Sequence, residues 1–161
     1  MPEKRSRRNM SLKVSDSAPD FELINQFGQK TSLSSFNGKK NVVVLFYPFA
    51  FSGICTGELC ALRDDLGSFQ NDKVELLAIS CDPMYSLKMF GEKEGYKFQL
   101  LSDFWPHGEV ARKYGVFNEE RGCAVRGTFV IDKSGKVRWQ IVNSLGDARN
   151  LVDYKAALSA L

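Results

Sequence analysis

One stretch of the chain joins a buried strand to a helix through a short loop, and it restricts the possible folds more than any other. Residues 42–47 form a continuous apolar run rich in β-branched and aromatic side chains, which indicates a strand covered on both faces of a sheet. Pro48 ends this strand, because proline cannot donate a hydrogen bond to a neighbouring strand. A helical pattern over residues 55–69 follows the loop 49–54. This order of elements predicts an α/β domain.

Cys55 lies where the loop meets the first turn of the expected helix. The N-terminal end of a helix carries partial positive charge and unpaired N–H groups, which favour a thiolate over a thiol. A thiolate in such a position is a candidate nucleophile. The alternative is that Cys55 is a small buried core residue, which is the usual place of a free cysteine.

Pro48, Ser52 and Cys55 stand in the spacing P-x-x-x-[TS]-x-x-C, and this pattern resembles the active-site motif of the peroxiredoxins. Three further segments are similar to landmarks of the same family: APDF at 18–21, LSDFWPHGEVARKYGVF at 101–117 and RGTFVID at 126–132. Within the family, WPHGEVARKYGVFNEERG at 105–122 and RGTFVID are most similar to the AhpE type. Together the landmark segments span nearly the whole chain after its first residues. The family most often has threonine at the position of Ser52. Serine keeps the hydroxyl and loses the methyl group.

The resemblance implies a thioredoxin-like α/β fold, and the order of strands and helices predicts a mixed β-sheet with helices on both faces and an N-terminal β-hairpin. The resemblance also implies a thiol peroxidase that reduces hydrogen peroxide and organic hydroperoxides without a metal or other cofactor. The reductant would be a thioredoxin-like or glutaredoxin-like protein or a low-molecular-weight thiol, and a homodimer is one expected assembly. A redox-regulated chaperone or peroxide sensor that uses Cys55 stays open as an alternative.

The same resemblance implies that Cys55 attacks the peroxide and becomes a sulfenic acid. It also assigns roles to four residues around Cys55. Pro48 would shield the sulfur from water, and Ser52 would bond the thiolate and peroxide oxygens. Arg126 would stabilise the thiolate and the leaving oxygen with directional donors, and Glu58 would hold that arginine. Without the resemblance, these four are a strand terminator, a loop or capping serine, a surface arginine and a helix-stabilising glutamate.

Cys60 follows Cys55 by five residues, and this pattern resembles the Q-type (bacterioferritin comigratory) peroxiredoxins, whose second cysteine resolves the sulfenic acid as a disulfide. In an intact helix the two Cα atoms would be roughly 8.6 Å apart, whereas a disulfide needs about 4.4–6.8 Å. The helix must therefore unwind, and Gly57 lowers its stability by about 1 kcal/mol relative to alanine. The resemblance thus implies that Cys60 resolves the Cys55 sulfenic acid as an intramolecular disulfide, which a thioredoxin-like reductant would then reduce. The alternatives are a packing role for Cys60, with resolution by Cys123 or an external thiol.

The distribution of charged residues along the chain indicates whether the domain binds nucleic acid. Residues 1–9 contain four basic residues and one acidic residue, which accounts for the whole formal net charge of +3. A nucleic-acid-binding fold usually carries its excess charge on the domain itself, so we expect a disordered basic leader over 1–9, one peroxiredoxin domain over 10–161 and no nucleic-acid partner. Nucleic-acid binding by the leader is the open alternative.

No apolar stretch is long enough to cross a bilayer, so no membrane partner is expected. The four cysteines include no CxxC pair, which disfavours a zinc ribbon and a thioredoxin-type dithiol. Because no apolar signal segment is present either, a structural disulfide framework is disfavoured and a cytoplasmic location is expected.

The remaining elements are expected from periodicity and turn residues: a hairpin over 21–33, a buried strand over 74–80, a helix over 84–95, a short strand over 98–101, a short helix over 108–114, a hairpin of 126–132 with 137–142, and a terminal helix from Asp147. The apolar face of the terminal helix would comprise Leu151, Val152, Tyr154, Leu158 and Leu161. Phe104 and Trp105 are expected in the aromatic core, with a substrate or dimer surface as the alternative.

Overall fold

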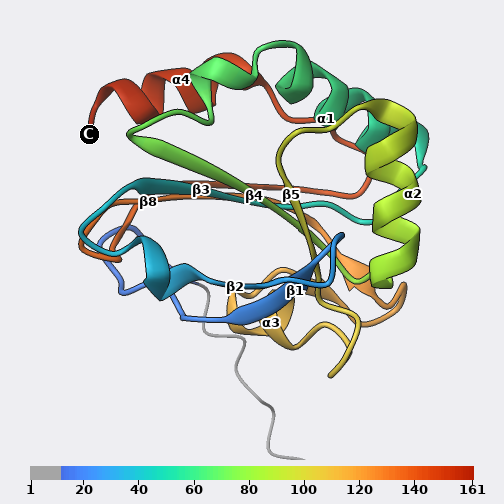
Figure 1. Ribbon diagram of the computed structural model, residues 1–161. Helices are drawn as coiled ribbons and strands as arrows, with labels where there is room; N and C mark the ends of the chain where they lie inside the picture. Colours follow the sequence, from blue (N-terminus) through green and yellow to red (C-terminus); the bar gives the residue numbers. More distant parts are fainter. Residues whose placement is uncertain (1–11) are drawn as a thin grey trace, which may run out of the picture.

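The structure, a computed structural model, describes residues 12–161 (Figure 1). The basic leader predicted at 1–9 and the first residues of the predicted domain lie outside this range. A seven-stranded sheet has the order β2-β1-β5-β4-β3-β8-β9. Its strands are β1 Glu22–Asn25, β2 Lys30–Ser32, β3 Asn41–Phe46, β4 Val74–Ser80, β5 Gln99–Ser102, β8 Arg126–Ile131 and β9 Val137–Asn143. The β3–β4 and β4–β5 pairs are parallel and the other pairs antiparallel, so the sheet is mixed, as predicted.

Helices cover both faces of this sheet, which confirms the predicted layers (Figure 1). The α-helices are α1 Gly53–Asp64, α2 Met84–Glu94, α3 Glu109–Lys113 and α4 Leu151–Ser159, and the short 3₁₀ helices are Leu33–Phe36 and Leu66–Ser68. Side chains of α1, α2 and α4 share one hydrophobic core, and side chains of α3 belong to the other. A separate small hairpin, β6 Phe117–Asn118 with β7 Cys123–Ala124, was not predicted. Within residues 12–161, no helix is both long and apolar enough to span a bilayer.

Strand β3 separates the two cores. Val42, Val44 and Phe46 face the core that contains α3, whereas Val43 and Leu45 face the core beneath α1 and α2. All five side chains are at most 1% exposed. Because side chains alternate between the faces of a strand, a strand covered on both faces needs a continuous apolar run, and the prediction for this stretch is confirmed.

The register of the sheet brings distant segments together where β3 ends and α1 begins. Strand β8 runs antiparallel to β3, with Val42 opposite Ile131 and Leu45 opposite Thr128. Arg126, the first residue of β8, therefore lies at the same end of the sheet as the C-terminus of β3. Cys55 lies at this end too, in the helix that follows the loop after β3, and contacts Arg126.

The terminal helix differs from its prediction. It begins at Leu151 rather than at Asp147, and Asn150 caps it by accepting a hydrogen bond from the N–H of Val152 at 2.9 Å. Arg149, just before this cap, is only 8% exposed, and its backbone N–H and its side chain both donate to Glu58. A buried arginine thus delays the start of the helix.

Two expectations about burial were wrong. Val152 and Leu161 are 66% and 42% exposed, because the short α4 buries mainly the stripe that carries Tyr154 against Trp139 and the sheet. Phe104 and Trp105, expected in the core, are 48% and 81% exposed, since they lie in the surface loop between β5 and α3.

Candidate active site

Cys55 is the third residue of α1, and its side chain is buried against Arg126. Ser52 precedes the helix as its N-cap, and the Ser52 Oγ accepts a hydrogen bond from the Cys55 N–H at 3.4 Å. The Cys55 Sγ lies 3.3 Å from the Arg126 Nη1, and the residue is 0% exposed. Both the helix N-terminus and the guanidinium favour negative charge on this sulfur.

Two buried arginines hold the carboxylate of Glu58, one turn further along α1. Arg126 donates from Nη1 to Glu58 Oε1 at 2.5 Å. Arg149 donates to the same carboxylate from Nε at 2.9 Å, from Nη2 at 3.0 Å and from its backbone N–H at 2.7 Å. One carboxylate between two guanidinium groups leaves a net positive charge, which a thiolate at Cys55 would neutralise.

The environment of Glu58 keeps it ionised. Burial acts to raise its pKa, but the hydrogen bonds and charge of Arg149, followed by the charge of Arg126, hold the pKa below its ordinary value. The side chains of Glu58, Arg126 and Arg149 are only 6%, 3% and 1% exposed. A charged cluster this deep is stable only because its members pair with one another.

Arg149 was missed by the sequence analysis. Its Nη1 also donates to the carbonyl of Phe46 at 2.6 Å, to the carbonyl of Gly127 at 3.0 Å and to Thr128 Oγ1 at 3.1 Å. It therefore ties the end of β3 and the start of β8 to α1. The available signal was Asn150, a favourable N-cap residue, which places Arg149 outside the helix but does not reveal its burial.

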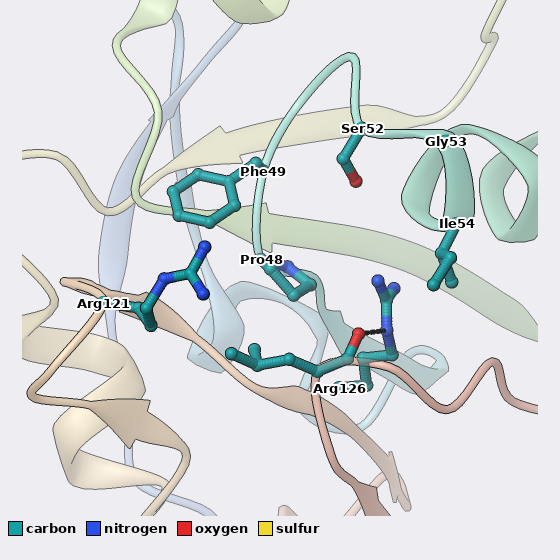
Figure 2. Close-up of a pocket in the computed structure, with 8 residues that line it drawn as sticks. Pro48, Phe49, Ser52, Gly53, Ile54, Arg121 and Arg126 are labelled. Carbon is teal, nitrogen blue, oxygen red and sulfur yellow. Dashed lines mark hydrogen bonds between the residues drawn. The ribbon is translucent and has the colours of Figure 1, made fainter.

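A pocket of about 240 Å³ opens beside this cluster (Figure 2). It is lined by Pro48, Phe49, Ser52, Gly53, Ile54, Arg121, Arg126 and Leu145. Figure 2 shows the hydrogen bond from Arg126 Nε to the Leu145 carbonyl, at 2.8 Å. The predicted residues Pro48, Ser52 and Arg126 thus line one pocket. Cys55 is fully buried and is not among the lining residues, but its Sγ contacts Arg126, which is one of them.

Cys60 faces a different side of α1. Its Sγ lies 3.5 Å from the Tyr96 hydroxyl and 3.6 Å from Glu94 Oε2, near the C-terminus of α2. The helix is continuous from Gly53 to Asp64, so it separates the two sulfurs by about 140° of rotation over five residues. The predicted resolving cysteine is thus not adjacent to Cys55 in this structure.

Cys81 and Cys123 are buried, at 7% and 0% exposure. Burial raises the pKa of Cys81 to about 12 and also raises the pKa of Cys123. Both thiols are therefore poor nucleophiles here, and the reserve role suggested for Cys123 stays a prediction. Residues 12–161 contain no group of three His, Cys, Asp or Glu side chains placed to hold a metal ion.

Comparisons with known proteins identify the family. Residues 14–140 match the model of the AhpC/TSA family. Alkyl hydroperoxide reductase E of Mycobacterium tuberculosis is 48% identical to the chain over 150 residues, which cover 93% of this chain and 98% of that protein. The chain belongs to the AhpC/TSA family of peroxiredoxins.

Other peroxiredoxins agree with this assignment. Peroxiredoxin Bcp of Escherichia coli is 38% identical over 132 residues, covering 78% of this chain and 83% of that protein. The crystal structure of peroxidoxin BcpB from Mycobacterium tuberculosis matches with a TM-score of 0.83 and 34% identity over 93% of this chain and 98% of the other. The predicted family, the thioredoxin-like fold and the enzyme class, a thiol peroxidase, are confirmed.

Proposed function

We propose that this peroxiredoxin uses Cys55 as its peroxidatic residue. The Cys55 thiolate attacks one peroxide oxygen, the O–O bond breaks, and the other oxygen leaves as an alcohol or water after taking up a proton. Sulfur is oxidised to a sulfenic acid and the peroxide is reduced. The observation that carries the proposal is the 3.3 Å contact between Arg126 Nη1 and the Cys55 Sγ at the N-terminus of α1.

Arg126 is the residue best placed to stabilise the leaving oxygen. Its Nε and Nη1 are bonded to Leu145, Glu58 and Cys55, whereas its Nη2 has no hydrogen-bond partner among residues 12–161. Those free N–H groups can therefore donate to peroxide oxygens as charge develops. Glu58 keeps the guanidinium in place, and Pro48 forms part of the wall that keeps water from the sulfur. Ser52 serves as the N-cap, and its predicted contact with the peroxide stays a prediction.

Replacing Arg126 by lysine should lower kcat/KM for hydrogen peroxide by about 10²–10³-fold. A single ammonium cannot contact Cys55, Glu58 and the Leu145 carbonyl at once, although the charge is kept. Stopped-flow kinetics of the first oxidation would measure the change. Arg138→Lys, at an exposed ion pair with Asp132, is the matched control and should stay close to wild type. A loss below tenfold in Arg126→Lys would contradict the role of the guanidinium.

For the sulfenic acid, we propose reduction by an external thiol, from a thioredoxin-like or glutaredoxin-like protein or a low-molecular-weight thiol. The disulfide with Cys60, predicted from the Cys-x4-Cys spacing, is the alternative. Residues 55–60 would have to unwind to form it, and this would pull Glu58 away from Arg126 and Arg149. Breaking a buried ion pair costs about 3–5 kcal/mol, which favours the external thiol. The homodimer and the cytoplasmic location stay predictions.

Intact mass after one equivalent of hydrogen peroxide separates these routes. We expect the fully reduced protein to gain one oxygen atom, and this gain should require Cys55 and persist in Cys60→Ser. Loss of two hydrogens that requires both Cys55 and Cys60 would instead support the intramolecular disulfide, and Gly57→Ala should then slow its formation by stiffening the helix. No rapid change at Cys55 would overturn the peroxidatic assignment itself.

A further inference from the structure

The pocket beside Cys55 is larger than hydrogen peroxide requires. Its volume of about 240 Å³ corresponds to roughly eight water molecules at about 30 Å³ each. Pro48, Phe49, Ile54 and Leu145 give it apolar walls, and Phe49 and Ile54 are 37% and 40% exposed. Pockets with apolar walls and a few charged groups bind organic ligands in one orientation. The pocket therefore has room for the organic group of a hydroperoxide.

Arg121 is a second cation in this pocket, and none of the roles above uses it. Figure 2 shows Arg121 on one side of the pocket and Arg126 on the other, with Pro48 between them in this view. The Arg121 side chain is exposed and forms no ion pair or hydrogen bond with any of residues 12–161; only its backbone N–H is bonded. Glu119, in the same turn, is paired with Arg112 instead. The Arg121 guanidinium is thus free to bind an anion.

The turn that carries Arg121 is well anchored. Asn118 Oδ1 accepts hydrogen bonds from the N–H groups of Glu120 at 3.0 Å and Arg121 at 2.9 Å. Gly122 follows with a φ of 64°, which glycine adopts without strain. Its carbonyl lies 2.7 Å from His107 Nε2. The backbone under Arg121 is therefore held in place before any ligand arrives, which reduces the entropy lost on binding.

We propose that Arg121 binds the carboxylate of organic hydroperoxides that carry one, and so determines a substrate preference. The inference rests on the proposed function, in which Cys55 reduces the peroxide group in the same pocket. Arg126 is already committed: its Nε and Nη1 contact the Leu145 carbonyl, Glu58 and Cys55, and the proposed function assigns its free Nη2 to the peroxide oxygens. The planar fork of a guanidinium matches the two oxygens of a carboxylate. The apolar walls between the two arginines would contact the carbon chain that joins the two ends of such a substrate.

The test compares two hydroperoxides of equal shape, one with a terminal carboxylate and one with the primary amide in its place. The measured quantity is the ratio of kcat/KM for the acid to kcat/KM for the amide, with the first oxidation of Cys55 as the readout. Arg121→Gln should lower this ratio about fivefold, as expected for a partly exposed ion pair, and Arg121→Glu should lower it further. Arg138→Gln removes an exposed arginine far from the pocket and should leave the ratio unchanged.

A ratio that changes less than twofold in both Arg121 variants would overturn the inference. Thermal unfolding of each variant shows that it is folded, and because the quantity is a ratio within one variant, a general loss of activity cancels. Hydrogen peroxide serves as a third substrate. If it oxidises Cys55 while the ratio is insensitive to Arg121, only this inference fails. If hydrogen peroxide does not oxidise Cys55, the proposed function fails and this inference fails with it.

Discussion

Replacing Cys55 by serine is expected to abolish peroxide reduction, with a loss on the order of 10⁴-fold or more. A serine hydroxyl is not ionised at neutral pH by one guanidinium and a helix N-terminus, and oxygen cannot take up a further oxygen as sulfur does. Consumption of hydrogen peroxide in the first turnover would measure the loss. Cys60→Ser should keep that first turnover, because its sulfur faces Tyr96 and Glu94 on the other side of α1. First-turnover activity that survives in Cys55→Ser would place the reactive group elsewhere.

The second large effect concerns stability. Arg149→Met should lower the free energy of unfolding by about 3–5 kcal/mol, because it leaves buried Glu58 with one partner fewer. It also removes the donors to the carbonyls of Phe46 and Gly127. Urea unfolding would measure this, with the milder variant Arg149→Lys beside it in case Arg149→Met does not fold.

The matched control for this prediction is Arg138→Met. Arg138 forms an ion pair with Asp132 at 3.4 Å, but its side chain is 54% exposed. Its removal should therefore cost at most about 1 kcal/mol. Equal losses in Arg138→Met and the Arg149 variants would contradict the view that the buried pairing of Glu58 stabilises the fold.

Acid supplies an independent check on the same cluster. The folded-state pKa of Glu58 is lowered from its ordinary 4.5, so its pairing contributes fully to stability above that value. The contribution is lost as the pH falls through the lowered pKa, because the unfolded chain then binds a proton more readily than the folded one. Glu58→Gln should remove this part of the acid destabilisation, which the urea midpoint as a function of pH would show. An unchanged pH profile would mean that other carboxylates cause it.

Local patterns in the chain were enough to predict the centre of the fold and to make Cys55 a candidate nucleophile. The apolar run 42–47 required a strand covered on both sides, Pro48 ended it, and the following helix placed Cys55 in its first turn. These features depend on backbone hydrogen bonding and on the alternation of side chains between residues close together in the sequence. They can therefore be predicted from a short stretch of sequence. The roles of Ser52, Arg126 and Glu58 came from resemblance to a family motif, because spacing alone equally suits a cap, a strand end and a helix-stabilising residue.

Contacts between distant segments followed from the packed fold instead. The register of β3 against β8 places Arg126 beside Cys55, 71 residues earlier in the chain. Arg149 reaches Glu58 across 91 residues and delays the start of α4, and no local pattern marks an arginine as buried. Arg121 likewise lines the same pocket as Pro48 only because the β6–β7 hairpin carries it there. Burial and pairing of charges depend on which segments the sheet brings together, and this information is spread over the whole chain rather than held in any one stretch.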